Sequence, residues 1–176
     1  HTRYISVTGV QTCALPICGH LQIFDTYLPN TRLRIRQARD PKTNAWNRML
    51  QQRSCVVEAG VMVTKLADIH LDDDEFLLFE RMRGAETRKN RYFHEFDGVS
   101  TQFDVYLGEL RGLTTAKAEF TTARSMSEYE PPPFMIFEVT GDPFFESRRL
   151  AEATFADVEA EIARRSEEHT SELQSH

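Results

Sequence analysis

Three arginines alternate with apolar residues in the stretch "FDTYLPNTRLRIR", which spans residues 24–36. Side chains on a β-strand alternate between the two faces of the sheet, so Arg32, Arg34 and Arg36 would share one face. Like charges side by side on a sheet repel one another. This face is therefore either the solvated outer face of an amphipathic sheet or a concave wall that binds a polyanion, and the stretch alone leaves both interpretations open.

The composition limits the classes of partner. The chain has 176 residues and a formal net charge of −6, which suits one domain with a real core. No apolar run is long enough to cross a membrane, and broad nucleic-acid binding needs a basic footprint that an acidic chain lacks. Cys13, Cys18 and Cys55 have no C-x-x-C spacing, which argues against a disulfide framework or a zinc site and favours a cytoplasmic setting. We expect neither a membrane nor a nucleic-acid partner.

The two ends of the chain can be encoded by DNA strings that are reverse complements of each other. "VTGVQTCALPI" (residues 7–17) can be encoded by a string whose reverse complement, shifted in frame and extended by one A, encodes "RSEEHTSELQS" (residues 165–175). This string resembles a short-read sequencing adapter, and such segments are set aside before fold reasoning. We therefore expect residues 1–17 and 165–176 to be non-native tails with few contacts beyond an extension of the last helix. Residues 18–164 would form one domain, encoded by an internal fragment of a gene.

The remaining segment reads mainly as β-strands. Pro29-Asn30 and Asp97-Gly98 are turn signals, and the second is typical of a tight hairpin. Asp72, followed three residues later by Glu75, predicts a capped helix start. An amphipathic run predicts a closing helix over residues 150–165. Strands are predicted over residues 20–28, 31–39, 47–57, 61–71, 87–96, 100–110, 113–122 and 137–140. Strands in this meander order predict an antiparallel sheet, closed or strongly curved.

Polar and apolar faces recur along these strands. Lys89 shares a face with Arg91, Gln102 with Asp104, and Lys117 with Glu119. The opposite faces carry Leu33, Ile35, Phe103, Val105, Ala116, Ala118 and Phe120. This alternation fits a small barrel with an apolar interior, and it equally fits a tunnel with a polar interior and helices packed outside. Periodicity does not choose between the two.

Four blocks, in order, resemble the CYTH domains of the triphosphate tunnel metalloenzymes. Residues 25–36, "DTYLPNTRLRIR", are similar to the family's tyrosine-leucine turn followed by R-x-R-x-R, and "RKNRY" (88–92) is similar to K-T-R-Y. "FDVYLGELRGLTTAKAEF" (103–120) is similar to V-D-V-F-x-G-x-L-x-G-L-x-x-A-E-x-E-F, and "FEVTGDPFF" (137–145) to E-V-T-x-D-x-x-[YF]. The order and spacing of these blocks cover nearly the whole of residues 18–164.

The resemblance implies a mainly β fold, an antiparallel barrel or tunnel of about eight strands with a charged bore and helices outside. Here it would be incomplete, because the family's first strand falls in the region of residues 1–17. Basic side chains would hold a triphosphate, since the arginine fork matches phosphate oxygens. The implied phosphate ligands are Arg32, Arg34, Arg36, Arg53, Lys89 and Arg91. Carboxylates would hold Mg²⁺ or Mn²⁺, and the implied metal ligands are Glu119, Asp104 and Glu138.

Two departures bear on activity. The family's first strand carries E-x-E-x-K, which residues 1–17 do not supply, and Lys117 stands where the family has the first acid of an E-x-E pair. We expect a CYTH-like domain that binds a triphosphate-containing small molecule, from a parent protein that is a divalent-metal-dependent triphosphatase, with inorganic triphosphate favoured. This fragment is expected to be inactive or nearly so. The alternative is a non-catalytic polyphosphate- or nucleotide-binding module. An apolar-ligand barrel is disfavoured by the basic faces.

Overall fold

A computed structural model describes residues 2–8, 19–58, 61–82, 84–96, 98–133, 135 and 137–174. In this part of the chain, nine antiparallel strands form one sheet in the order β5-β4-β3-β2-β6-β7-β8-β1-β9. The strands are β1 (Thr2–Thr8), β2 (His20–Tyr27), β3 (Leu33–Arg39), β4 (Trp46–Glu58), β5 (Val61–His70), β6 (Ala85–Phe96), β7 (Val99–Tyr106), β8 (Leu113–Glu119) and β9 (Phe137–Glu138). The helices are α1 (Asp73–Glu80), the 3₁₀ turn η2 (Gly108–Leu110), α2 (Ala123–Ser127), α3 (Ser147–Leu150) and α4 (Phe155–Gln174).

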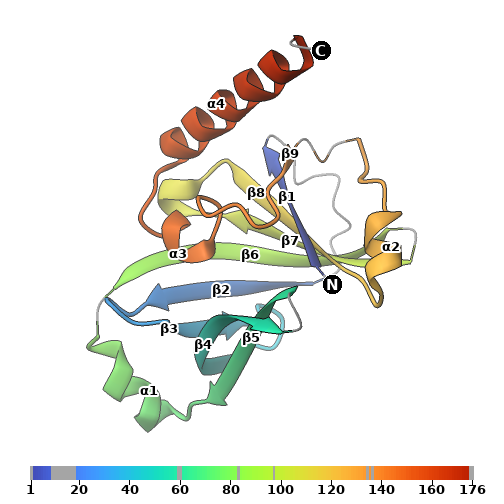
Figure 1. Ribbon diagram of the computed structural model, residues 1–176. Helices are drawn as coiled ribbons and strands as arrows, with labels where there is room; N and C mark the ends of the chain where they lie inside the picture. Colours follow the sequence, from blue (N-terminus) through green and yellow to red (C-terminus); the bar gives the residue numbers. More distant parts are fainter. Residues whose placement is uncertain are drawn as a thin grey trace.

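The sheet is strongly curved, and the long strand β6 joins its two halves (Figure 1). Strands β2 to β5 form a meander on one side of β6, and β7 and β8 continue the sheet on the other. Strands β5 and β9 stand at its two edges, so among the described residues the sheet is open rather than closed. The expectation of a mainly β, antiparallel, incomplete tunnel is confirmed. None of the helices in the described part of the chain is both long and apolar enough to span a membrane.

Local sequence signals explain the chain reversals. Asn30 adopts a φ of 56° in the turn between β2 and β3, a left-handed conformation that asparagine tolerates. Gly98 adopts a φ of 76° between β6 and β7, whereas Asp97 lies outside the described residues. Helix α1 starts with the expected capping box, in which the Asp72 side chain accepts from the Glu75 backbone N–H and the Glu75 side chain accepts from that of Asp72. Both the turns and the helix start follow the sequence prediction.

One apolar cluster lies between helix α1 and the outer face of the sheet. Its buried members are Leu28, Ile35 and Phe76, and Leu33 packs against them. Leu33 and Ile35 therefore face away from the alternating arginines, as predicted. Gly84 follows the helix, and an added Cβ there would lie 1.7 Å from the backbone oxygen of Tyr27. Only glycine permits the chain to pass so close to β2 as it enters β6.

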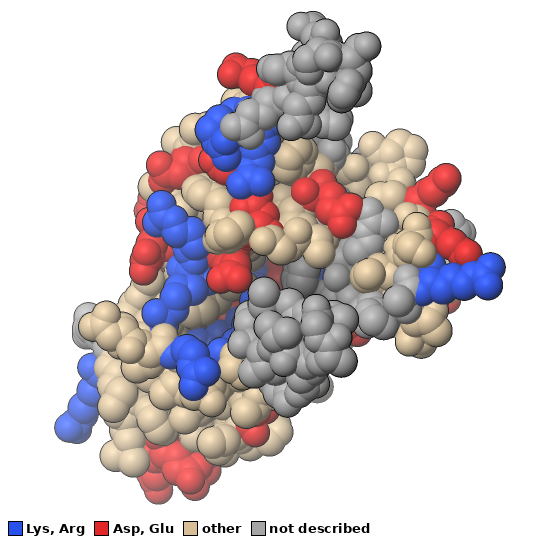
Figure 2. Space-filling model, viewed as in Figure 1, with Lys and Arg blue, Asp and Glu red and all other residues tan. Residues whose placement is uncertain are grey.

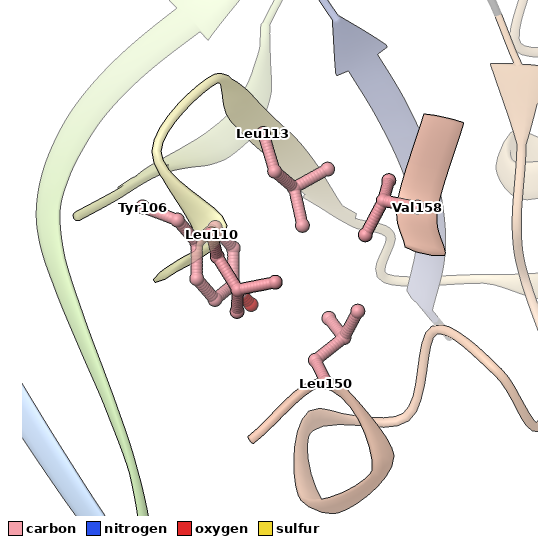
Figure 3. Close-up of a cluster of buried hydrophobic side chains, with 5 residues drawn as sticks. All are labelled: Tyr106, Leu110, Leu113, Leu150 and Val158. Carbon is pink, nitrogen blue, oxygen red and sulfur yellow. The ribbon is translucent and has the colours of Figure 1, made fainter. Parts of the chain in front are cut away.

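A second apolar cluster lies at one end of the opposite, inner face. Figure 3 shows its five buried members converging from β7, η2, β8, α3 and α4, and they are Tyr106, Leu110, Leu113, Leu150 and Val158. Tyr106 pairs with Lys89 in register, so these two residues share a face. Helix α3 and the start of α4 thus cover one end of the inner face, whereas α1 packs outside. The sequence prediction had placed all helices outside.

The terminal segments make more contacts than expected. Thr2–Thr8 forms β1, pairing with β8 from Thr2–Glu119 to Thr8–Leu113 and with β9 through Ile5–Glu138. The expectation of few contacts is therefore wrong for these residues. The edge of β8 offers backbone groups that need partners, and "RYISVT" is rich in residues that favour strands. Helix α4 continues to Gln174, as expected, and Arg165 pairs with Asp142 and Glu161. The adapter origin of both tails stays a prediction.

Candidate anion-binding site

The register between β2 and β3 places an acid opposite an arginine of the quoted stretch. Asp25 pairs with Arg36, and both side chains point to the inner face. The Arg36 guanidinium donates to both carboxylate oxygens of Asp25, Nε to Oδ1 at 2.7 Å and Nη2 to Oδ2 at 2.6 Å. Nη1 of Arg34 lies 3.6 Å from the same Oδ2. Asp25 is completely buried and Arg36 is 9% exposed, so this pair is held in the interior of the protein.

A matching pair joins β6 and β7. Arg91 lies opposite Asp104 and donates from Nε to Oδ1 at 2.7 Å and from Nη2 to Oδ2 at 2.8 Å. Lys89, two residues before Arg91, lies between the two carboxylates. Its Nζ is 2.7 Å from Oδ2 of Asp104 and 4.0 Å from Oδ2 of Asp25. Lys89 therefore connects the halves of the sheet electrostatically, and the resulting inner cluster consists of Asp25, Arg34, Arg36, Lys89, Arg91 and Asp104.

The inner cluster keeps both acids ionised. Burial alone would raise the pKa of Asp25, but the charge and hydrogen bonds of Arg36, with the charges of Arg34 and Lys89, lower it to about 2. Burial likewise opposes ionisation of Asp104, and Lys89 and Arg91 together hold its pKa well below the usual range. Four cations face two carboxylates, so these six side chains carry a surplus of two positive charges. Such a surplus in a partly desolvated site attracts an anion.

Neutral polar groups surround the inner cluster. Nε of Arg34 donates to Oε1 of Gln51 at 2.7 Å, and Nε2 of Gln51 donates to Asp68 at 3.0 Å. Arg34 also lies 3.4 Å from the hydroxyl of Tyr27. Thr87 pairs in register with Asp25, and its buried hydroxyl has no hydrogen-bond partner among the described residues. The hydrogen bonds to Gln51 and Tyr27 orient Arg34.

The two remaining predicted phosphate ligands, Arg32 and Arg53, lie outside the inner cluster. Arg32 and Arg53 are exposed, and the backbone N–H of Arg53 donates to the carbonyl of Arg32 at 3.4 Å. Arg32 therefore differs from Arg34 and Arg36, because it precedes β3 rather than lying within it. Figure 2 shows Lys and Arg side chains gathered along a hollow on one face of the molecule. The structure thus brings Arg34, Arg36, Lys89 and Arg91 together, with two further arginines outside.

The three predicted metal ligands do not converge. Asp104 is engaged by Lys89 and Arg91, and Glu119 is paired with Lys117 and accepts from Gln102 at 3.5 Å. Glu138 pairs in register with Ile5, one step from the Ser6–Phe137 pair. Since Ser6 and Asp104 both lie opposite Thr115, Glu138 belongs to the other face of the sheet.

The described residues do not fit a divalent cation. Among them, no group of three His, Cys, Asp or Glu side chains could hold a metal ion. A cation beside Asp104 would also lie next to Lys89 and Arg91, whose charges repel it. The assignment of Asp104, Glu119 and Glu138 as metal ligands stays a prediction from the resemblance.

Sequence reasoning missed Asp25, Gln51 and Thr87. An isolated acid or amide in a strand carries little signal by itself. Counting outward from a two-residue Pro29-Asn30 turn would pair Asp25 with Arg34, whereas the observed longer connection pairs it with Arg36. In either register Asp25 lies opposite an arginine, so hairpin register was the usable signal for this residue. Gln51 requires the register of the next strand pair, β3 with β4, which the less regular connection over residues 40–45 does not determine.

Comparisons with known proteins agree with the fold. No protein-family model matches the chain. The chain is 30% identical over 86 residues to an inorganic triphosphatase from Nitrosomonas europaea, a match that covers 48% of this chain and 57% of that protein. It therefore spans little more than half the length of that relative.

Two solved structures share the architecture across almost their whole length. The crystal structure of the hypothetical protein NE1496 matches with a TM-score of 0.60 and 22% identity, covering 88% of this chain and 98% of the other. The crystal structure of the inorganic triphosphatase NE1496 matches with a TM-score of 0.59 and 21% identity, covering 86% and 97%. At these identities the likeness establishes the fold. The chain thus has a CYTH-type fold, that of the triphosphate tunnel metalloenzymes.

Proposed function

We propose that the inner face of this sheet binds a triphosphate-containing small molecule, with inorganic triphosphate favoured. The observation that carries the proposal is the convergence of Arg34, Arg36, Lys89 and Arg91 on two buried carboxylates, with a net surplus of positive charge. Arginine forks match phosphate oxygens in two-point contacts. The similarity to a protein named inorganic triphosphatase supports the same class of ligand.

Isothermal titration calorimetry with tripolyphosphate tests this proposal. Replacing Arg34 by Ala should weaken binding roughly 10- to 100-fold, because a hydrogen bond to a charged group contributes about 1.5–3 kcal/mol. Arg88→Ala is the matched control, since Arg88 is exposed and paired with Glu86 at 2.6 Å, and it should bind as the wild type does. Equal affinities for both variants, or no binding by the wild type, would contradict the proposal.

Hydrolysis is a separate matter. For a parent protein, the resemblance predicts a divalent-metal-dependent triphosphatase, but the described residues supply no group of three metal ligands. Lys117 also adds a positive charge beside Glu119. These observations favour the second candidate, a non-catalytic polyphosphate- or nucleotide-binding module. We expect this chain to release little phosphate from inorganic triphosphate with Mg²⁺ or Mn²⁺, and brisk metal-stimulated release would exclude the second candidate.

A further inference from the structure

We propose that this chain binds triphosphate without a divalent cation, and that Asp104 acts as an internal counter-anion which the ligand displaces from Lys89 and Arg91. This inference rests on the proposed function and deepens it. It assigns Asp104 a role opposite to that of a metal ligand. The two roles predict opposite effects when its charge is removed.

Asp104 is held by two cations of the inner cluster. Both of its oxygens accept from Arg91, at 2.7 and 2.8 Å, and Oδ2 also lies 2.7 Å from Nζ of Lys89. A divalent cation would have to replace these contacts and would then stand beside two positive charges. A phosphate group carries the same sign of charge as the carboxylate that it replaces. Its oxygens can accept from the same guanidinium and ammonium groups. The geometry thus suits substitution of one anion by another.

The two acids of the inner cluster differ in their exposure to water. Asp25 is fully enclosed, whereas the Asp104 side chain is 11% exposed. The side chains of Lys89 and Asp25, 3% and 0% exposed, fill the centre of the inner cluster. An incoming anion therefore reaches Lys89 and Arg91 by displacing the more accessible carboxylate. Asp25 can stay in place and keep Arg36 oriented toward the ligand.

Displacement of Asp104 changes the charge balance of the inner cluster. With Asp104 displaced, the cations of the inner cluster are opposed by Asp25 alone, so their attraction for a polyanion rises. Complexation by Mg²⁺ reduces the negative charge of a triphosphate and hence its attraction to these cations. Each of these features favours the metal-free ligand.

Calorimetry on the full chain provides the test, with tripolyphosphate titrated in EDTA and again in excess Mg²⁺. The wild type should bind at least as tightly in EDTA as in Mg²⁺. Asp104→Asn should bind about fivefold or more tightly than the wild type in EDTA, because a competing charge within a few ångströms is removed. Glu86→Gln, which changes an exposed carboxylate that pairs with Arg88 on the outer face, should stay within about twofold of the wild type.

The outcomes separate the two proposals. Wild-type binding that needs Mg²⁺, or Asp104→Asn binding that is unchanged or weaker in EDTA, overturns the counter-anion role while the triphosphate site stands. Absence of binding in both buffers overturns the proposed function itself. If Asp104→Asn does not fold, the wild-type comparison of EDTA with Mg²⁺ still decides whether binding is metal-free.

Discussion

Two groups of carboxylates accompany the basic residues of the inner face, and they differ in their access to water. Asp25 and Asp104 have side chains that are 0% and 11% exposed. Each carboxylate accepts hydrogen bonds from Nε and Nη2 of one arginine. The Glu119 side chain lies outside the inner cluster, is 46% exposed and pairs with Lys117. An exposed ion pair contributes little to the free energy of folding, because water screens its charges, whereas the two charges of a buried ion pair interact strongly. Burial, more than the identity of the acid, therefore decides which ion pairs organise the site.

The largest expected effect comes from breaking the buried pair. Asp25→Asn leaves the Arg36 guanidinium enclosed without its counter-charge, and removal of one member of a buried ion pair typically costs about 3–5 kcal/mol. We expect a loss of this size in the free energy of unfolding measured by urea denaturation. A loss below about 1 kcal/mol would show that water reaches Arg36 and would remove the distinction between the two groups.

Lowering the pH should reduce the free energy of unfolding by an intermediate amount. The pKa of Asp25 is lowered from 3.8 to about 2 in the folded protein, so the folded state favours the ionised form. Its contribution is complete above the unfolded pKa and is lost as the pH falls from about 4 through 2. A difference of nearly two pKa units corresponds to about 2 kcal/mol.

Comparison with the neutral variant isolates this contribution. The difference in unfolding free energy between the wild type and Asp25→Asn should shrink by about 2 kcal/mol as the pH is lowered from 5 to 2. Other carboxylates titrate in both proteins and cancel in the difference. A difference independent of pH would mean that Asp25 titrates normally in the folded state.

The smallest change in the free energy of unfolding is expected at the exposed Glu119. Glu119→Gln should change the free energy of unfolding by less than about 1 kcal/mol, because exposed ion pairs are screened by water and salt. Urea denaturation at low and high salt measures this change, which should diminish further as salt is added. A loss comparable to that of Asp25→Asn would place Glu119 in the same class as the buried acids.

The sequence predicted the faces of the strands better than the partners of the charges. Alternation over residues 32–36 has a strict period of two, so the apolar positions Leu33 and Ile35 had to lie opposite Arg34 and Arg36. Ion pairs depend instead on cross-strand register. Asp25 was therefore missed, although the turn that sets its partner was recognised.

Edges and short strands were the least predictable parts. Strand β9 has two residues, and no periodicity over so short a length reveals that Glu138 and Asp104 lie on different faces. The few contacts predicted for residues 1–17 were wrong for Thr2–Thr8, because the edge of β8 pairs with a segment rich in strand-forming residues. Helix α3 was missed as an element that covers the inner face, because its four residues carry no helical period.

The placement of the arginines also has a consequence for how the chain folds as it is synthesised. Asp25 finds Arg36 eleven residues later, and Asp104 follows Arg91 by thirteen residues. Each acid can therefore be neutralised within its own hairpin, without waiting for the pairing of β2 with the distant β6. Contacts between near neighbours form before those that close long loops. The two hairpins can then dock with their charges already satisfied, and the contact between Lys89 and Asp25 forms last, when β6 pairs with β2.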